Sequence, residues 1–149
     1  MTKVELQDAR QRVKKRLSEY LDVKREYAQV LEKLKDIEAI MTSPRAQKLD
    51  GMPRGGSGGD PMSAIVAQHI TLEERYREQL WRLAEAQCAV EEMIESLEPG
   101  ERKLMRHRYI DGLSWERVCV AMSYSWRATH NIHARALDKL AEKEYTQAV

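Results

Sequence analysis

The chain has 149 residues, with 25 Lys and Arg against 24 Asp and Glu, a formal net charge of +1, and 6% aromatic residues. This length suits one ordinary domain or two small modules, and excludes a large enzyme barrel or a doubly wound sheet with an added substrate domain. The near-zero charge argues against a protein that coats nucleic acid or membranes by bulk electrostatics, although it leaves room for a local basic patch.

Residues 1–41 carry apolar side chains at a helical repeat. One track recurs every seven residues, and a second track runs beside it. These positions are Leu6, Val13, Tyr20, Tyr27, Leu34 and Met41, then Val23, Val30 and Ile37, with Leu17 and Leu31 one position further on. The pattern is typical of an amphipathic helix, so the sequence predicts one long N-terminal helix.

Residues 42–61 have a different composition, holding five of the seven glycines and three of the four prolines. Glycine maximises backbone entropy and proline removes a hydrogen-bond donor, so this stretch is predicted to be a flexible linker. Residues 62–98 then resume the helical pattern, which predicts a second long helix. Its apolar positions are Ile65, Val66, Leu72, Tyr76, Leu80, Leu83, Val90, Met93, Ile94 and Leu97.

The two predicted long helices each leave an apolar stripe to cover. The simplest arrangement is a coiled-coil-like antiparallel helical hairpin, although the same heptads could pair with a second subunit and form a homodimer.

Charge is divided unevenly beyond the linker. Residues 62–98 hold three basic and eight acidic side chains, whereas residues 99–149 hold nine and six. The second long helix is therefore acidic and the C-terminal segment basic.

Residues 99–149 are predicted to form three short helices. Pro99 suits the first turn of the first helix, which ends near Gly112, and Ser114 and Ser125 suit the N-caps of the other two. The inward positions are Leu104, Met105, Tyr109 and Ile110, then Trp115, Val118, Cys119 and Met122, then Thr129, Ile132, Ala136, Leu137 and Leu140. The last two helices are joined by a short turn, and the second of them carries basic and polar residues on its solvent-exposed side. This is the layout of a helix-turn-helix.

The third helix of this segment carries a predicted DNA-reading face. Helical spacing places Arg127, His130, Asn131 and Arg135 together on it. Arginine can pair bidentately with guanine and asparagine with adenine, so Arg127 and Asn131 are the preferred base readers. Trp126, at the start of this helix, is expected either to touch DNA or to pack on the first helix of the segment.

Other basic and hydroxyl side chains suit phosphate contacts, which position a protein on DNA without specifying sequence. The predicted set is Lys103, Arg106, Arg117 and the cap Ser125, together with Arg102, Arg108, Lys139 and Ser114. The competing interpretation of all these residues is a solvated basic face of a small helical domain.

The run from Leu97 to Leu140 resembles the helix-turn-helix of region 4 in bacterial primary-type sigma factors. The resemblance is carried by a Pro-Glu-Arg-like opening, an Arg-Tyr near the first helix end, a Ser cap and an Ile-x-x-x-Ala-Leu-x-x-Leu finish, written here as LEPGERKLMRHRYIDGLSWERVCVAMSYSWRATHNIHARALDKL. The versions RYIDGLSW and NIHARAL, placed after long helices and a Gly/Pro-rich linker, look like the phage-encoded regulators of the ArpU and RinA kinds. This resemblance implies an activator of late phage genes that works with host RNA polymerase in the bacterial cytoplasm.

Two features depart from the sigma pattern. The turn position that sigma factors usually fill with glycine is Ser123 here, where a left-handed backbone costs more. The base-reading positions of the family fall on Arg127, His130 and Asn131, whose identities differ from the usual Glu, Arg and Gln. The resemblance therefore does not imply recognition of the ordinary −35 hexamer.

The sequence predicts no enzyme, cofactor, metal site or membrane span. No nucleophile and base arrangement, phosphate-binding glycine loop or run of about 20 apolar residues is present. The pair His130 and His133 lacks a third metal ligand, and Cys88 and Cys119 lie far apart without a CxxC motif. Two alternatives to a transcription regulator remain, a coiled-coil adaptor that does not bind DNA and a DNA-recognition subunit of a phage packaging machine.

Overall fold

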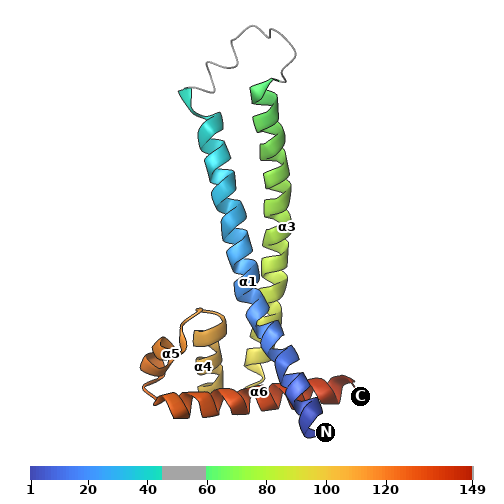
Figure 1. Cartoon of the computed structure of the whole chain (residues 1–149), viewed down its shortest axis with the longest axis vertical. Coiled ribbons are helices and arrows are strands. Elements are labelled where there is room, and N and C mark those ends of the chain that lie inside the picture. The colour runs from blue at the N-terminus through green and yellow to red at the C-terminus, as the bar shows by residue number, and fades with distance from the viewer. Residues whose placement is uncertain (45–59, 149) are drawn as a thin grey trace. The chain divides into compact units, whose positions relative to one another are not determined.

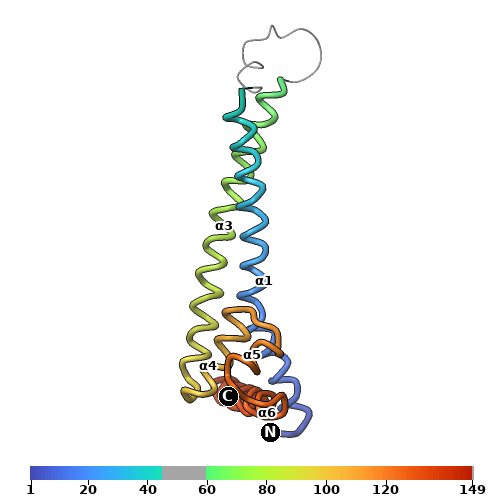
Figure 2. The backbone as a smooth tube through the Cα atoms, turned by 90° about the vertical axis from the view of Figure 1, so that its left-hand side faces the viewer, coloured from blue at the N-terminus to red at the C-terminus, as the bar shows by residue number. Residues whose placement is uncertain are grey.

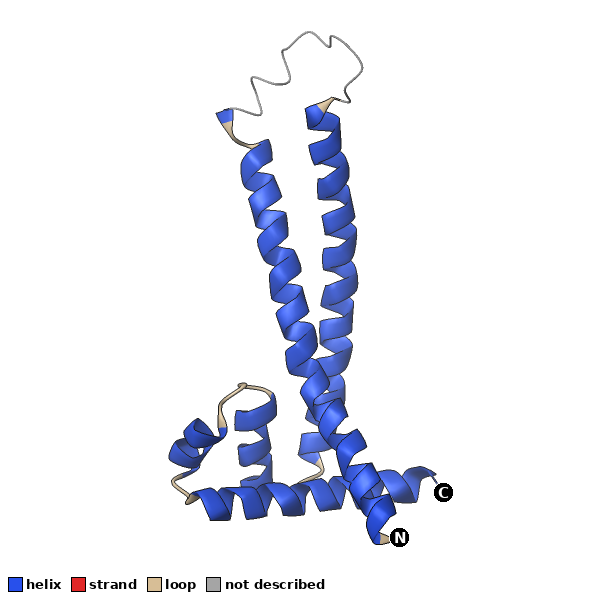
Figure 3. Cartoon of the chain, viewed as in Figure 1, coloured by secondary structure: helices blue, strands red, loops and turns tan. Residues whose placement is uncertain are grey.

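The computed structural model describes residues 1–44 and 60–148, and all the regular elements in these ranges are α-helices (Figure 1, Figure 3). They are α1 (Lys3–Met41), α3 (Pro61–Glu95), α4 (Pro99–Tyr109), α5 (Trp115–Met122) and α6 (Trp126–Ala148). The prediction of an all-α fold is confirmed for these residues, and none of their helices is long and apolar enough to cross a membrane. Most of the predicted linker, residues 45–59, lies outside the described residues.

The helix boundaries follow local capping chemistry. Helix α3 ends at Glu95 rather than continuing to 98, because Glu98 is the N-cap of α4. The backbone N–H of Glu98 donates to the Glu101 carboxylate (3.4 Å), which closes a capping box, and Pro99 occupies the first turn, where its missing N–H costs nothing. Helix α6 continues to Ala148, beyond the predicted buried positions that end at Leu140.

The chain divides into two compact units, which are described separately. Unit 1 comprises Met1–Asp22 and Ala84–Val149, and unit 2 comprises Val23–Leu83. In unit 2, a small apolar cluster is formed by Leu34, Ile37 and Leu72, with Met41, Ile65 and Tyr76 packed against it. The cluster joins residues of α1 and α3, so the two helix segments of unit 2 cover each other's apolar stripes.

Polar contacts in unit 2 fix the direction of the two segments. Arg82 lies 3.3 Å from Glu26, while His69 lies 3.5 Å from Glu38. Later residues of α1 thus meet earlier residues of α3, and the segments run antiparallel within this unit. Leu80, which the sequence pattern places in the buried stripe, is 44% exposed. Pairing between two chains stays a prediction.

Unit 1 is built around mutual contacts of α4, α5 and α6. Helices α4 and α5 lie on the same side of α6 (Figure 1, Figure 2). The start of α1 and the end of α3 add to the buried side chains of this unit. Its buried apolar residues are Ala9, Val13, Leu17, Tyr20, Val90, Ile94, Leu97, Leu104, Met105, Tyr109, Val118, Ala136, Leu137, Leu140 and Ala141. Of the inward positions predicted for α5, only Val118 is fully buried, because this eight-residue helix is covered on one narrow side.

The turn between α5 and α6 contains a left-handed residue. Ser123 has φ 56° and ψ 38°, and the N–H of Tyr124 donates to the carbonyl of Cys119 (3.1 Å), which ends α5. Serine hydroxyls cap the starts of both helices, since Ser114 Oγ accepts from the N–H of Arg117 and Ser125 Oγ accepts from the N–H of Ala128. The predicted caps and turn are therefore present at the predicted positions.

We expect Ser123→Gly to raise the free energy of unfolding by about 1 kcal/mol, because glycine removes the Cβ strain of the left-handed conformation. Thermal unfolding followed by circular dichroism measures this. The matched variant Ser125→Ala, two residues away, removes a helix cap and should lower stability by about 1 kcal/mol. A Ser123→Gly protein less stable than wild type would contradict the role assigned to the turn.

Candidate nucleic-acid interface

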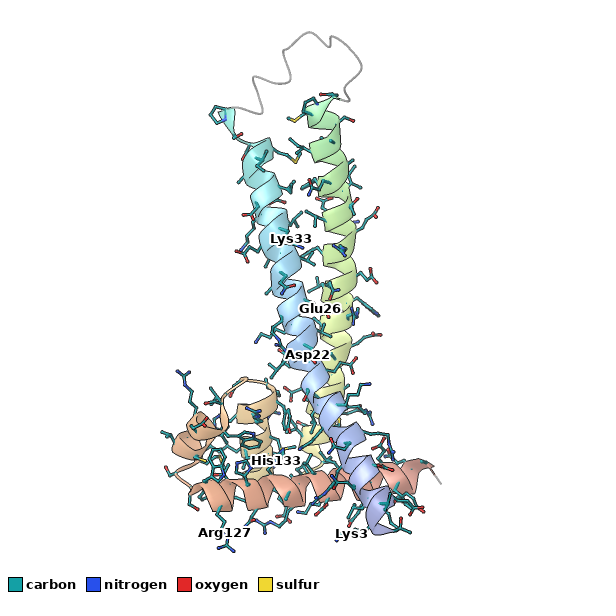
Figure 4. All side chains as sticks on the ribbon, in the orientation of Figure 1. Lys3, Asp22, Glu26, Lys33, Arg127 and His133 are labelled. Carbon is teal, nitrogen blue, oxygen red and sulfur yellow. The ribbon has the colours of Figure 1, made fainter. Side chains whose placement is uncertain are left out.

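The exposed side of α6 presents Arg127, Asn131 and Arg135, which follow one another at a spacing of four residues. All three are exposed, whereas Thr129 and Ala136 on the other side of the helix are completely buried. Arg127 points away from α4 and α5 (Figure 4). The arrangement leaves two guanidinium groups and one carboxamide available to the edges of bases.

The sequence around this face is basic. Residues 114–137, which comprise α5, the turn and the first half of α6, contain three arginines and one acidic residue, Glu116. Arg117 on α5 and Lys103 on α4 are also exposed. These two predicted phosphate-contacting side chains remain accessible to solvent in unit 1.

Asp138, a carboxylate that follows Arg135 on the same side of α6, is paired with a side chain of α1. Arg10 Nε donates to Asp138 Oδ1 (2.5 Å), and the same guanidinium donates to the carbonyl of Ala134 (3.4 Å). The ion pair compensates a negative charge near Arg135 that would otherwise repel a phosphate backbone. Sequence spacing gave no sign of this pair, because its partners are 128 positions apart.

Three of the cations predicted for phosphate contacts have protein partners instead. Arg106 forms a bidentate ion pair with Glu91, with N–O distances of 3.1 and 2.6 Å. Lys139 lies 2.8 Å from the buried carboxylate of Glu101, and its pKa is raised by that hydrogen bond. Arg108 donates to the carbonyl of Leu113 (2.9 Å). Tertiary packing thus supplies these side chains with acceptors that the local pattern does not reveal, and their contact with phosphate stays a prediction.

His130, which helical spacing places on the predicted DNA-reading face, is less exposed than its neighbours Arg127 and Asn131. Its ring is partly buried between Trp115 and Trp126, with ring centroids 4.6 and 4.4 Å away. Its Nε2 atom is buried and has no hydrogen-bond partner among the described residues. Trp126 and His130 are four positions apart on one helix, so their contact could have been anticipated from spacing, whereas the contribution of Trp115 from α5 could not. His130 has a packing role here, and Trp126 remains 53% exposed.

A buried polar pair lies between α4 and α6. The Tyr109 hydroxyl and His133 Nε2 are 2.7 Å apart, and His133 points toward α4 and α5 (Figure 4). Burial raises the pKa of Tyr109 to about 12. Burial, with the neighbouring cations Lys14, Arg108 and Arg10 and the ring of His130, lowers the pKa of His133 to about 4. Both groups are neutral near pH 7, so the phenol can donate to the imidazole nitrogen.

No protein family, curated protein or solved structure matches the chain. The resemblance to sigma region 4 therefore rests on the residues between Leu97 and Leu140 alone and stays a prediction.

The predicted site residues fall into two groups in unit 1. Arg127, Asn131, Arg135, Trp126, Arg117 and Lys103 are exposed. Arg106, His130 and the hydroxyl of Ser125 are engaged in an ion pair, a ring contact and a helix cap, respectively. Among residues 1–44 and 60–148, no three His, Cys, Asp or Glu side chains gather as a metal site requires.

Proposed function

We propose that the protein is a sequence-specific double-stranded DNA-binding transcription regulator, with α5, the turn and α6 acting as a helix-turn-helix and α6 entering the major groove. The observation that carries this proposal is the row of Arg127, Asn131 and Arg135 on the exposed side of α6. Arginine pairs bidentately with guanine O6 and N7, and asparagine with adenine N6 and N7.

The remaining exposed cations suit the DNA backbone. Arg117 and Lys103 come from α5 and α4, which flank α6, and they would position the module on phosphates. The resemblance to sigma region 4 and to the phage ArpU and RinA kinds supports an activator of phage or prophage genes that acts at the promoter with host RNA polymerase. The long helices α1 and α3 would then supply self-association or a contact with the polymerase.

Selection of bound duplexes from random double-stranded DNA, followed by mobility-shift titrations at several salt concentrations, tests this function. We expect one enriched sequence class, bound at least 1,000-fold more tightly than unrelated duplex. The logarithm of the association constant should fall with the logarithm of salt concentration by about 0.9 per phosphate contact. Failure to enrich any sequence, or binding that is indifferent to salt, would contradict the proposal.

A coiled-coil adaptor without DNA binding is the second candidate, and one observation favours it. Leu80 and Trp81, consecutive residues of α3, are 44% and 68% exposed, so both large apolar side chains are accessible to a partner. An adaptor would use this surface to bind protein, and it predicts no salt-dependent DNA binding. The selection experiment therefore separates the two functions directly.

A further inference from the structure

A chain of side-chain contacts fixes Trp126 at the start of α6. The guanidinium carbon of Arg108 lies 4.7 Å from the Trp115 ring centre, Trp115 lies 4.6 Å from His130, and His130 lies 4.4 Å from Trp126. Arg108 is itself anchored to the carbonyl of Leu113. Trp126 packs against His130, and His130 packs against Trp115. These contacts leave the Trp126 side chain less rotational freedom than an ordinary half-exposed tryptophan has.

The far end of this chain of rings faces solvent. Trp126 is 53% exposed, and two further large apolar side chains next to the turn are exposed as well, Val120 by 80% and Tyr124 by 45%. Exposure of these groups contributes nothing to the stability of unit 1, since apolar side chains stabilise a fold when they leave water. The fold thus orders an indole while leaving half of its surface free for another molecule.

The surrounding charge indicates what that molecule is. Residues 114–137 contain three arginines and a single glutamate, so a polyanion is attracted to this region and a basic protein surface is not. The exposed Leu80 and Trp81 lie instead in residues 62–98, with eight acidic side chains against three basic ones. Double-stranded DNA is a polyanion that also offers apolar groups, because its major groove carries the C5-methyl group of thymine.

We propose that Trp126 contacts the C5-methyl group of a thymine adjacent to the base pair read by Arg127. This inference rests on the proposed function and adds a specificity that hydrogen-bonding residues alone would not give. Trp126 directly precedes Arg127 in the first turn of α6, the part of a recognition helix that meets base edges. Val120 and Tyr124 extend the apolar surface around the turn.

Uracil substitution tests the contact, because uracil pairs like thymine and lacks only the methyl group. Starting from the selected duplex, each thymine is replaced by uracil in turn, and dissociation constants are measured by mobility shift. At the contacted position, wild type should lose about fourfold in affinity, as expected for one buried methyl group. Trp126→Ala should bind the thymine duplex and the duplex with uracil at that position equally tightly. The affinity loss caused by the protein substitution and the loss caused by the uracil substitution are then not additive.

Three further variants keep the outcome decisive. Trp126→Phe retains an aromatic ring and should retain a preference for thymine, which guards against a folding defect in the alanine variant. Trp81→Ala removes an even more exposed tryptophan from α3 and should behave as wild type. Val120→Ala should reduce overall affinity at most slightly.

Specific binding by wild type that no uracil substitution weakens would overturn the methyl contact while leaving the proposed function intact. Equal sensitivity to uracil in wild type and Trp126→Ala would overturn the assignment to Trp126. Absence of sequence-specific binding would overturn both.

Discussion

Arg127→Ala should lose roughly 5- to 150-fold in affinity for the selected duplex while binding unrelated duplex almost as well as wild type. A good bidentate contact to a base contributes about 1–3 kcal/mol of discrimination, and the loss falls on the specific complex because a base edge is what distinguishes sequences. Asn131→Ala should lose discrimination at a different base pair, since the two side chains are one helical turn apart on α6. Competition mobility shifts at fixed salt, with duplexes changed at one base pair, measure both effects.

Two control variants distinguish base reading from general attraction. Arg117→Ala, which removes an exposed cation from α5, should weaken binding to every sequence alike and reduce the salt slope by about one. Lys33→Ala removes an exposed cation from unit 2 and should leave both affinity and specificity unchanged. If Arg127→Ala and Asn131→Ala keep the wild-type preference, then α6 does not read bases through this face.

Acidification should destabilise the wild-type protein through His133. Its pKa in the folded chain is about 4, below the ordinary value of 6.5, so the unfolded chain takes up a proton first as the pH falls. This contribution to stability is complete above pH 6.5 and is lost between pH 6.5 and 4. At about 1.4 kcal/mol per pKa unit, the loss is on the order of 3 kcal/mol. Urea unfolding at pH 7 and pH 4.5 measures it.

Comparison with two histidine variants isolates this effect from the carboxylates that titrate in the same range. His133→Gln should be less stable than wild type at pH 7, because it perturbs the buried contact with Tyr109, but it should lose less stability on acidification. His69→Gln removes a histidine from unit 2, leaves His133 and its neighbours intact, and should therefore keep the wild-type loss. An unchanged pH dependence in His133→Gln would show that burial of this imidazole is not responsible.

The helices and their caps could be predicted from sequence because their causes are local. The apolar repeat of residues 1–41 matches α1 to its last residue, and the hydroxyls of Ser114 and Ser125 cap α5 and α6 where helix-capping chemistry places them. The predicted end of the second long helix, residue 98, lies three residues beyond Glu95, where α3 ends, because Glu98 is the N-cap of α4. At this boundary the end of one helix and the cap of the next lie within a few residues of each other, so the sequence signals for the two overlap.

The candidate site was predictable only where helical spacing decides exposure. That spacing is sufficient for Arg127, Asn131 and Arg135, which lie opposite the buried side of α6. It fails for Arg106 and His130, whose partners Glu91 and Trp115 come from other helices. A cation can be assigned to solvent from sequence only if no carboxylate reaches it in the folded chain, and that depends on packing.

The ion pair between Arg10 and Asp138 also bears on how the protein is made. Residues near both ends of the chain meet in unit 1, where Ala9, Val13 and Leu17 from α1 are buried along with Leu140 and Ala141 from α6. During synthesis the first 22 residues leave the ribosome early and must wait for the last helix before their apolar side chains are covered. Assembly of unit 1 is consequently a late event, and a C-terminal fragment that begins at residue 99 would lack part of its own core.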